Sequence, residues 1–285
     1  MRRSLLFMPA NSPSMLQNSS VFDCDAVIYD LEDAVSITNK DSARILLDSF
    51  LKYNVVMDST NMEVVVRING MDTIYYMDDL ETIVSDKIDT IMLPKARVEY
   101  LIELDKILSK LEEKRKMKKK LNVIPIIELA ISLLEVEEIV KCPRVNGILL
   151  GGEDFTSDME VERTKVGNEI FYARCKVATA CHAYGIDAID TPFTDVNDNE
   201  GLIKDTTFVK SIGMTSKAAI HPNQIDVINN IFVPSKKMID WSVRVDYASK
   251  QDTTGVFSLD GKMVDKPVMD RARKILEKAK KYGLL

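Results

Sequence analysis

The chain has 285 residues, and 46% of them are hydrophobic, which is enough to build a large buried core in one α/β domain. Its 44 acidic side chains outnumber its 38 basic ones, and the resulting net charge of −6 argues against general binding to nucleic acid or to an anionic membrane. Every apolar run is shorter than the roughly 18 residues that a membrane-spanning helix needs.

The first residues resemble a secretory signal only superficially. The segment MRRSLLFMPANS starts with two arginines and an apolar stretch, but that stretch is too short and meets Pro9. The four cysteines form no CxxC pair. Without a secretory signal ahead of them, we expect reduced thiols and a cytoplasmic location.

Short apolar runs alternate with longer amphipathic segments through the first 222 residues. Most of these runs lack a period of two, which is typical of strands covered on both faces of a parallel sheet. Eight strands alternating with helices predict a (β/α)8 TIM barrel, and an open doubly wound sheet is the second choice. The predicted strands are 4–9, 26–32, 63–69, 90–95, 122–128, 146–154, 185–193 and 217–222, and the clearest helices are 98–120 and 166–185.

The pattern changes after the last predicted strand. Residues 223–251 are predicted to be helical, residues 252–266 are loop-like and glycine-containing, and residues 268–282 form a final helix. We interpret the loop as a mobile flap attached to the barrel. The expected division is therefore a barrel over 1–232 and a C-terminal part over 233–285 that holds helices and the active-site flap.

Nearly every predicted strand ends in a polar or charged group. Barrel enzymes build their active sites at the carboxyl ends of the strands, so these groups are expected to converge on one mouth. Any single one of them could instead cap a helix, but that reading is weaker for the whole set. The set comprises Glu32, Asp33, Arg67, Asn69, Lys95, Glu128, Glu153, Asp154, Asp190 and His221.

Several carboxylates at one mouth repel each other unless a proton or a cation lies between them. The chain has only two histidines, so oxygen ligands for Mg²⁺ or Mn²⁺ are favoured over a zinc site. Glu128 and Asp154 end adjacent predicted strands and form the preferred pair, while Arg67 suits a substrate carboxylate. The residues alone predict a metal-assisted enzyme for a small oxo- or hydroxy-acid, with the reaction type open.

For four other residues the sequence predicts no direct part in the chemistry or leaves their role open. His221 is expected to fix the loop after the last strand, and His182 is expected to be structural. Lys95 is expected to order the mouth by pairing with acids rather than to form a Schiff base. Asp190 is either a mouth residue or a cap, and the sequence does not separate the two.

Nine short motifs, in order along essentially the whole chain, carry a family resemblance. The chain resembles the citrate lyase β subunits, within the citrate lyase/malyl-CoA lyase/HpcH-HpaI aldolase superfamily. Each motif is weak alone, and the common order and spacing give the signal its strength. The motifs are RRSLLFMP, DLEDAV, VVVRIN, LPKA, IIE at 126–128, GGED at 151–154, DTPFTD, IGMTSKAAIHPNQI and FSLDGKMVDKPVMDRA.

The resemblance implies a (β/α)8 barrel that assembles as a homotrimer or hexamer and uses Mg²⁺. Glu128 and Asp154 match the magnesium ligands, and Glu128 also contacts the substrate. Arg67 matches the arginine that binds the keto- or hydroxy-acid carboxylate and belongs to the catalytic set.

Three further acids complete the catalytic set that the resemblance implies. Glu32 and Asp33 match acidic residues near the metal and its waters. Asp265 matches an acid on the C-terminal flap, which in several relatives closes over the site of a neighbouring subunit.

The implied reaction is Mg²⁺-dependent retro-Claisen cleavage of a citryl thioester, on acyl-carrier protein or CoA, to oxaloacetate and an acetyl thioester. Asp265 is the candidate proton donor to the leaving carbanion, and the base for the hydroxyl is not assigned. Citrate lyase α and γ subunits are implied as partners. A stand-alone malyl-CoA or citramalyl-CoA lyase stays open, as does a non-catalytic subunit that keeps the fold.

Overall fold

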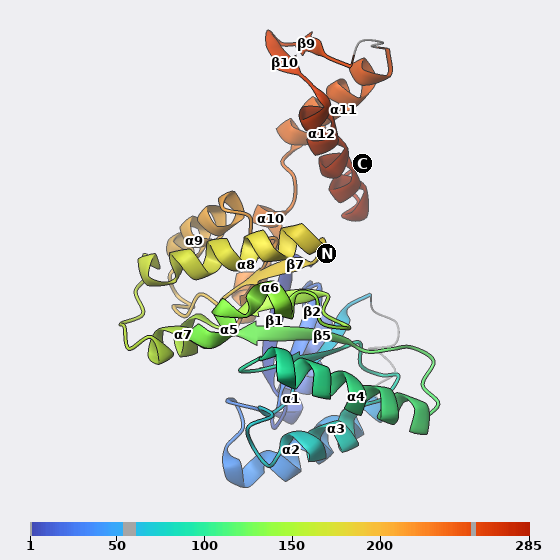
Figure 1. Ribbon diagram of the computed structural model, residues 1–285, viewed down its shortest axis with the longest axis vertical. Coiled ribbons are helices and arrows are strands. Elements are labelled where there is room, and N and C mark those ends of the chain that lie inside the picture. The colour runs from blue at the N-terminus through green and yellow to red at the C-terminus, as the bar shows by residue number, and fades with distance from the viewer. Residues whose placement is uncertain (1, 54–60, 252–254) are drawn as a thin grey trace. The chain divides into compact units, whose positions relative to one another are not determined.

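The computed structural model describes residues 2–53, 61–251 and 255–285, and eight parallel strands between residues 4 and 219 form a closed barrel (Figure 1). Each strand pairs with its neighbours in chain order, and β1 closes the ring against β8. The predicted (β/α)8 TIM barrel is confirmed. The strands are β1 Ser4–Pro9, β2 Ala26–Asp30, β3 Glu63–Arg67, β4 Thr90–Leu93, β5 Asn122–Ile127, β6 Gly147–Leu150, β7 Asp187–Asp190 and β8 Ser216–Ala219.

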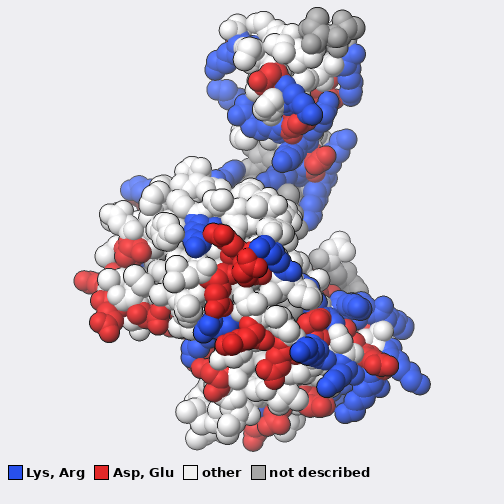
Figure 2. All heavy atoms as spheres, viewed as in Figure 1, with Lys and Arg blue, Asp and Glu red and all other residues white. Residues whose placement is uncertain are grey.

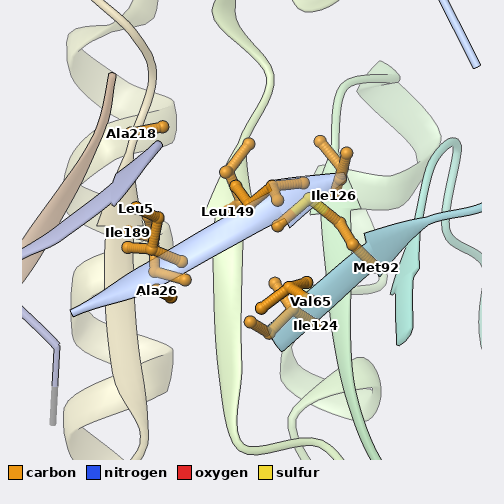
Figure 3. Close-up of a cluster of buried hydrophobic side chains, with 10 residues drawn as sticks. Leu5, Ala26, Val65, Met92, Ile124, Ile126, Leu149, Ile189 and Ala218 are labelled. Atoms are coloured by element: carbon orange, nitrogen blue, oxygen red, sulfur yellow. The ribbon is translucent and has the colours of Figure 1, made fainter. Parts of the chain in front are cut away.

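The barrel interior is filled by side chains rather than open (Figure 3). Strands contribute aliphatic residues that meet in one buried cluster, as in the layered interior of such barrels. Because this packing occupies the middle of the barrel, polar side chains that point inward lie at its ends. The cluster contains Leu5, Ala26, Ile28, Val65, Met92, Ile124, Ile126, Leu149, Ile189 and Ala218.

Helices connect the strands, and several expected boundaries move. The helix predicted over 98–120 ends at Lys114, and the one predicted over 166–185 begins at Phe171 after a 3-10 turn. The α-helices of this part are α1 Pro13–Asn18, α2 Lys40–Tyr53, α3 Tyr76–Ile83, α4 Val98–Lys114, α5 Ala130–Leu134, α6 Val136–Ile139, α7 Gly152–Asp158, α8 Phe171–Tyr184, α9 Asn199–Ser211 and α10 Ile225–Phe232. Described 3-10 turns are Ser19–Val21, Ile37–Asn39, Asn168–Ile170 and Pro222–Gln224.

The end of β6 differs from the prediction, and the difference moves two predicted site residues from a strand into a helix. The strand predicted over 146–154 stops at Leu150, and Glu153 and Asp154 lie in the first turn of α7. The backbone N–H of Gly151 still bonds to the carbonyl of Ile127 on β5, and the chain then turns into the helix. Acidic side chains are favourable in the first turn of a helix, which explains why these residues do not extend the strand.

The chain divides into two compact units, Met1–Asn229 and Asn230–Leu285, whereas the expected boundary lay between residues 232 and 233. The second unit contains α11 Lys236–Gln251, a two-stranded hairpin of β9 Phe257–Leu259 and β10 Lys262–Val264, and α12 Lys266–Lys281. Its core brings Val245, Val264 and Ala272 together with partly buried Trp241 and Phe257.

The expectation of a loop over 252–266 is wrong in its described part, and residues 252–254 lie outside the described residues. Asp260 and Gly261 both have positive φ, at 53° and 75°, between the paired strands β9 and β10. An Asp-Gly pair between alternating hydrophobic residues is a strong hairpin signal because a tight hairpin turn needs positive φ. The stretch FSLDGKMV carried that signal.

Length and hydropathy decide whether a helix can cross a membrane. None of the helices that the structure describes combines the length and the apolar character that a span requires.

Candidate active site

A hollow of about 250 Å³ opens at the carboxyl ends of the barrel strands. Five of the predicted site residues line it: Asp33 after β2, Arg67 at the end of β3, Glu128 after β5, and Glu153 and Asp154 in α7. Phe7 and Thr191 contribute to its walls. The convergence expected from the strand ends is therefore seen for these five residues.

Arg67 is held by a carboxylate that the sequence reasoning did not select, Asp30. The two residues are register partners on β2 and β3, and Arg67 Nε and Nη2 donate to the two oxygens of Asp30 at 2.7 and 2.6 Å. Asp30 is 2% exposed and also accepts the backbone N–H groups of Glu32 and Ala34. One buried carboxylate thus fixes both the arginine and the turn that follows β2.

The remaining edge of the Arg67 guanidinium faces the site. Its Nη1 lies 3.0 Å from Glu32 Oε2 and 3.4 Å from Asp33 Oδ2, and its carbon lies 5.0 Å from the centre of the Phe7 ring. Burial by itself would lower the pKa of Arg67, but the bonds to Asp30 outweigh it and raise that pKa. Arg67 is consequently a fixed positive charge whose bidentate fork is already occupied.

Glu128 is 3% exposed, and its Oε1 accepts the backbone N–H of Lys95 at 2.6 Å. The close packing around it needs a glycine, because a Cβ added at Gly151 would lie 2.7 Å from both Cβ and Oε2 of Glu128. Lys95 therefore orders the mouth through its backbone, with a φ of 48°, while its ammonium lies 3.9 Å from Asp72.

Two of these carboxyl groups hold protons more tightly than usual. Burial raises the pKa of Glu128 to about 8, and the charges of Glu32 and Asp154 add to the effect. Burial likewise raises the pKa of Glu32 to about 7, although Arg67 opposes it. Glu32 Oε2 is buried, and its 3.0 Å contact with Arg67 Nη1 lacks hydrogen-bond geometry, so this oxygen has no hydrogen-bond partner in the part of the chain that is described. The mouth therefore gathers more negative charge than its protein neighbours neutralise.

This donor set fits a magnesium ion better than a metal enclosed by protein ligands. Among residues 2–53, 61–251 and 255–285, no group of three or more His, Cys, Asp or Glu side chains is arranged to hold a metal. Mg²⁺ is commonly bound through one or two carboxylates, with water and substrate oxygens completing six ligands. Glu128 and Asp154, both lining the hollow, could supply that pair.

Asp265 lies in the second compact unit, at the start of α12. Its Oδ1 accepts the backbone N–H of Val268 at 3.3 Å, so in this unit it serves as the N-cap of the helix. Asp is among the best N-cap residues because its oxygen satisfies an otherwise unpaired N–H group.

Two strand-end residues do not belong to the mouth. Asn69 is buried, and its amide donates to the carboxylate of Asp79 and to the carbonyl of Leu31. Asp190 is fully buried and binds Arg174 and Lys217, so neither of its two expected roles, mouth residue or cap, is found. Both expectations failed because the sequence does not show which face of the barrel wall a strand end points to.

The histidines are structural, as expected. His221 is the N-cap of the turn Pro222–Gln224, and its Nδ1 accepts the backbone N–H of Asn223 at 3.2 Å. His182 Nε2 lies 2.8 Å from the carbonyl oxygen of Gly213.

Lys40, at the start of α2, is a second residue that the sequence reasoning missed. It is 7% exposed, and its Nζ donates to the carbonyl oxygens of Leu31 and Glu32 at 2.8 and 2.7 Å. A buried ammonium of this kind holds the turn that carries Glu32 and Asp33. The sequence gives no direct signal for it, since a lysine beginning an amphipathic helix is usually solvated.

A (β/α)8 barrel with an acidic hollow at the carboxyl ends of its strands has the architecture of a barrel enzyme. The profile of the HpcH/HpaI aldolase/citrate lyase family matches residues 3–222. The chain belongs to this family and is an enzyme of the lyase class.

Individual relatives agree with the family assignment. Citrate lyase subunit beta of Leuconostoc mesenteroides subsp. cremoris is 37% identical over 98% of this chain and 93% of its own length. Human mitochondrial citramalyl-CoA lyase is 31% identical over 95% of this chain and 84% of its own length. The solved structure of CitE from Mycobacterium tuberculosis, with magnesium, acetoacetate and coenzyme A, has a TM-score of 0.79, 29% identity and 97% coverage of both chains.

Proposed function

We propose that the chain cleaves a citryl thioester to oxaloacetate and an acetyl thioester in a Mg²⁺-dependent retro-Claisen reaction. The observation that carries the proposal is the convergence of Arg67, Glu128 and Asp154 on one hollow. A cation-binding pair opposite a fixed arginine suits a substrate with a hydroxyl group and a neighbouring carboxylate. The similarity to citrate lyase β subunits supports the choice of the citryl group.

Glu128 and Asp154 would hold the magnesium ion. When bound, the ion would acidify the substrate hydroxyl and offset the negative charge that develops on its oxygen. Asp154 sits in the first turn of α7, and Glu128 is fixed by the backbone of Lys95, so the two carboxylates come from separately anchored segments.

The substrate carboxylate would bind at the Nη1 edge of Arg67. Its Nε is used on Asp30, so a substrate oxygen would compete with Glu32 and Asp33 for the free edge. Glu32, with its raised pKa, can then take up a proton or turn toward metal-bound water, which is the orienting role we assign to Glu32 and Asp33.

The bond changes balance as follows. A base takes the hydroxyl proton. The electron pair of the O–H bond then forms the C=O bond of the keto group of oxaloacetate, and the carbon–carbon bond breaks. The electron pair of that bond becomes the enolate of the acetyl thioester, which needs one proton to give the methyl group. We assign that donation to Asp265, delivered by the C-terminal unit of this or a neighbouring subunit.

The assembly implied by this function is part of the proposal. We infer a cytoplasmic homotrimer or hexamer that works with citrate lyase α and γ subunits and takes its thioester from an acyl-carrier protein or from CoA. The similarity to a subunit of citrate lyase supports a multi-subunit enzyme.

A citramalyl-CoA lyase activity is the second candidate, favoured by the 31% identity to the human enzyme over 95% of this chain. The two are separated by assaying purified protein with citryl-, malyl- and citramalyl-CoA, with and without Mg²⁺. Oxaloacetate release from citryl-CoA that requires Mg²⁺ is expected. Cleavage of citramalyl-CoA alone would replace the proposed substrate, and cleavage of none would revive a non-catalytic subunit.

A further inference from the structure

The two compact units carry opposite net charges. Residues 230–285 hold 12 of the 38 Lys and Arg residues but only 7 of the 44 Asp and Glu residues, which is a net charge of +5. Residues 1–229 therefore carry −11. On the visible face of this unit, Lys and Arg side chains cover more of the surface than Asp and Glu side chains do (Figure 2). Such a difference within one chain favours binding of an anionic partner to the smaller unit.

The positive charge borders a groove inside this unit. The start of α11 and the β9–β10 hairpin enclose about 720 Å³, with Lys236 and Lys237 on one side and Lys262 on the other. Trp241, Met238 and Leu259 supply apolar surface within it. Tryptophan and methionine are enriched in protein interfaces, where an apolar centre with a polar rim is the usual arrangement.

The rim lysines are available to a partner. Among the described residues, the ammonium groups of Lys236, Lys237 and Lys262 form no salt bridge or hydrogen bond, and each of the three residues is exposed. Arg244 lowers the pKa of the Asp260 carboxyl group, and the charge of Lys262 adds to that effect. Arg244 is different because its guanidinium binds Asp260, with Nη1 to Oδ1 at 3.0 Å. Among the described residues that line the groove, four cationic side chains, three lysines and Arg244, face two carboxylates, Asp240 and Asp260.

We propose that this groove, with the basic rim formed by Lys236, Lys237 and Lys262, is the docking surface for an acidic carrier protein that presents the thioester. The inference rests on the proposed function, and it selects a protein-bound rather than a free thioester. A folded acidic protein matches both features of the groove, since its carboxylates can meet the lysines while an apolar side chain covers Trp241. Nucleic acid matches less well, because Asp240 and Asp260 interrupt the basic rim and the barrel is strongly acidic.

The groove contains its own probe, because Trp241 is the only tryptophan in the chain. The guanidinium of Arg271 lies 5.4 Å from the centre of its ring. A carrier that covers the groove should change the environment of this indole and thus its fluorescence. The experiment titrates the full-length protein with a tryptophan-free acyl-carrier protein bearing phosphopantetheine, and separately with CoA, at low and high salt.

Three charge reversals test the surface itself: Lys236→Glu, Lys237→Glu and Lys262→Glu together. The matched control makes the same change in net charge on the barrel unit, at the exposed lysines Lys110, Lys118 and Lys120. We expect the carrier to give a saturable fluorescence change whose dissociation constant rises about tenfold or more in the groove variant, and also with salt. The control variant should bind like the parent protein, and CoA should leave the fluorescence unchanged.

Several results would overturn the docking surface: no fluorescence change with the carrier, an equal change with CoA, or equal weakening in the control variant. Cleavage of citryl thioester is measured on the same samples to separate this inference from the proposed function. Carrier binding without cleavage of any thioester would refute the proposed function and leave the docking surface standing. Cleavage of the carrier-bound thioester with equal efficiency by the parent and the groove variant would refute the docking surface and leave the proposed function standing.

Discussion

Asp30→Asn is the substitution for which the structure gives the clearest energetic expectation. Asp30 Oδ1 accepts from Glu32 N at 2.9 Å and from Arg67 Nε at 2.7 Å, and Oδ2 accepts from Ala34 N at 3.0 Å and from Arg67 Nη2 at 2.6 Å. Whichever way the new amide points, its NH2 group faces two N–H donors. The variant therefore loses two bonds and leaves the charge of Arg67 without its buried partner.

Removing one partner of a buried ion pair lowers the free energy of unfolding by about 3–5 kcal/mol. Because asparagine keeps one acceptor oxygen, we expect a loss at the lower end of this range, about 3 kcal/mol. The measurement is urea-induced unfolding followed by circular dichroism, with the unfolding free energy extrapolated to water. Asp33→Asn is the matched control, because Asp33 also faces Arg67 but its side chain is 65% exposed. We expect the control to lose less than about 1 kcal/mol. A loss below about 1 kcal/mol for Asp30→Asn would refute the assigned role of this ion pair.

Gly151→Ala should lower magnesium affinity and turnover together while the protein stays folded, because the added Cβ would lie 2.7 Å from Glu128 Oε2; unchanged Mg²⁺ binding by calorimetry would contradict this. Asp265→Asn should reduce turnover sharply with little effect on Mg²⁺ or keto-acid binding, and undiminished turnover would remove Asp265 from the mechanism. Burial raises the pKa of Glu128 from 4.5 to about 8, so the metal-free folded protein holds a proton that the unfolded chain releases, and its stability should fall as pH rises across that range. Mg²⁺ and the proton compete for the same oxygens, so saturating Mg²⁺ should raise the unfolding temperature more at pH 8.5 than at pH 6; an equal rise at both would contradict ligation by Glu128.

The barrel could be predicted from the sequence because parallel strands covered on both faces leave a simple signal. The first strand was predicted over 4–9, as found, but others were drawn too long, for example 146–154 against Gly147–Leu150. Strand ends depend on which backbone groups pair across the sheet, and the side-chain pattern does not record that pairing. In the C-terminal unit the error was avoidable, because Asp260 and Gly261 signalled a hairpin turn.

The site could be predicted in part. The rule that polar strand ends converge at the mouth found Arg67, Glu128 and Asp154, which line one hollow. It missed Asp30, whose role depends on lying beside Arg67 in the β2–β3 register, and register is a property of the closed sheet. Lys40 was missed for a similar reason, since only the folded chain brings its ammonium under the turn after β2.

The ligand assignment is the central claim, and one measurement tests it most directly. A crystal of the protein soaked with Mn²⁺ and oxaloacetate gives an anomalous peak that marks the cation. We expect one peak within ligand distance of carboxylate oxygens of both Glu128 and Asp154, with oxaloacetate oxygens completing the coordination. A peak bound by Glu32 and Asp33 instead, or no ordered cation at the mouth, would contradict the account.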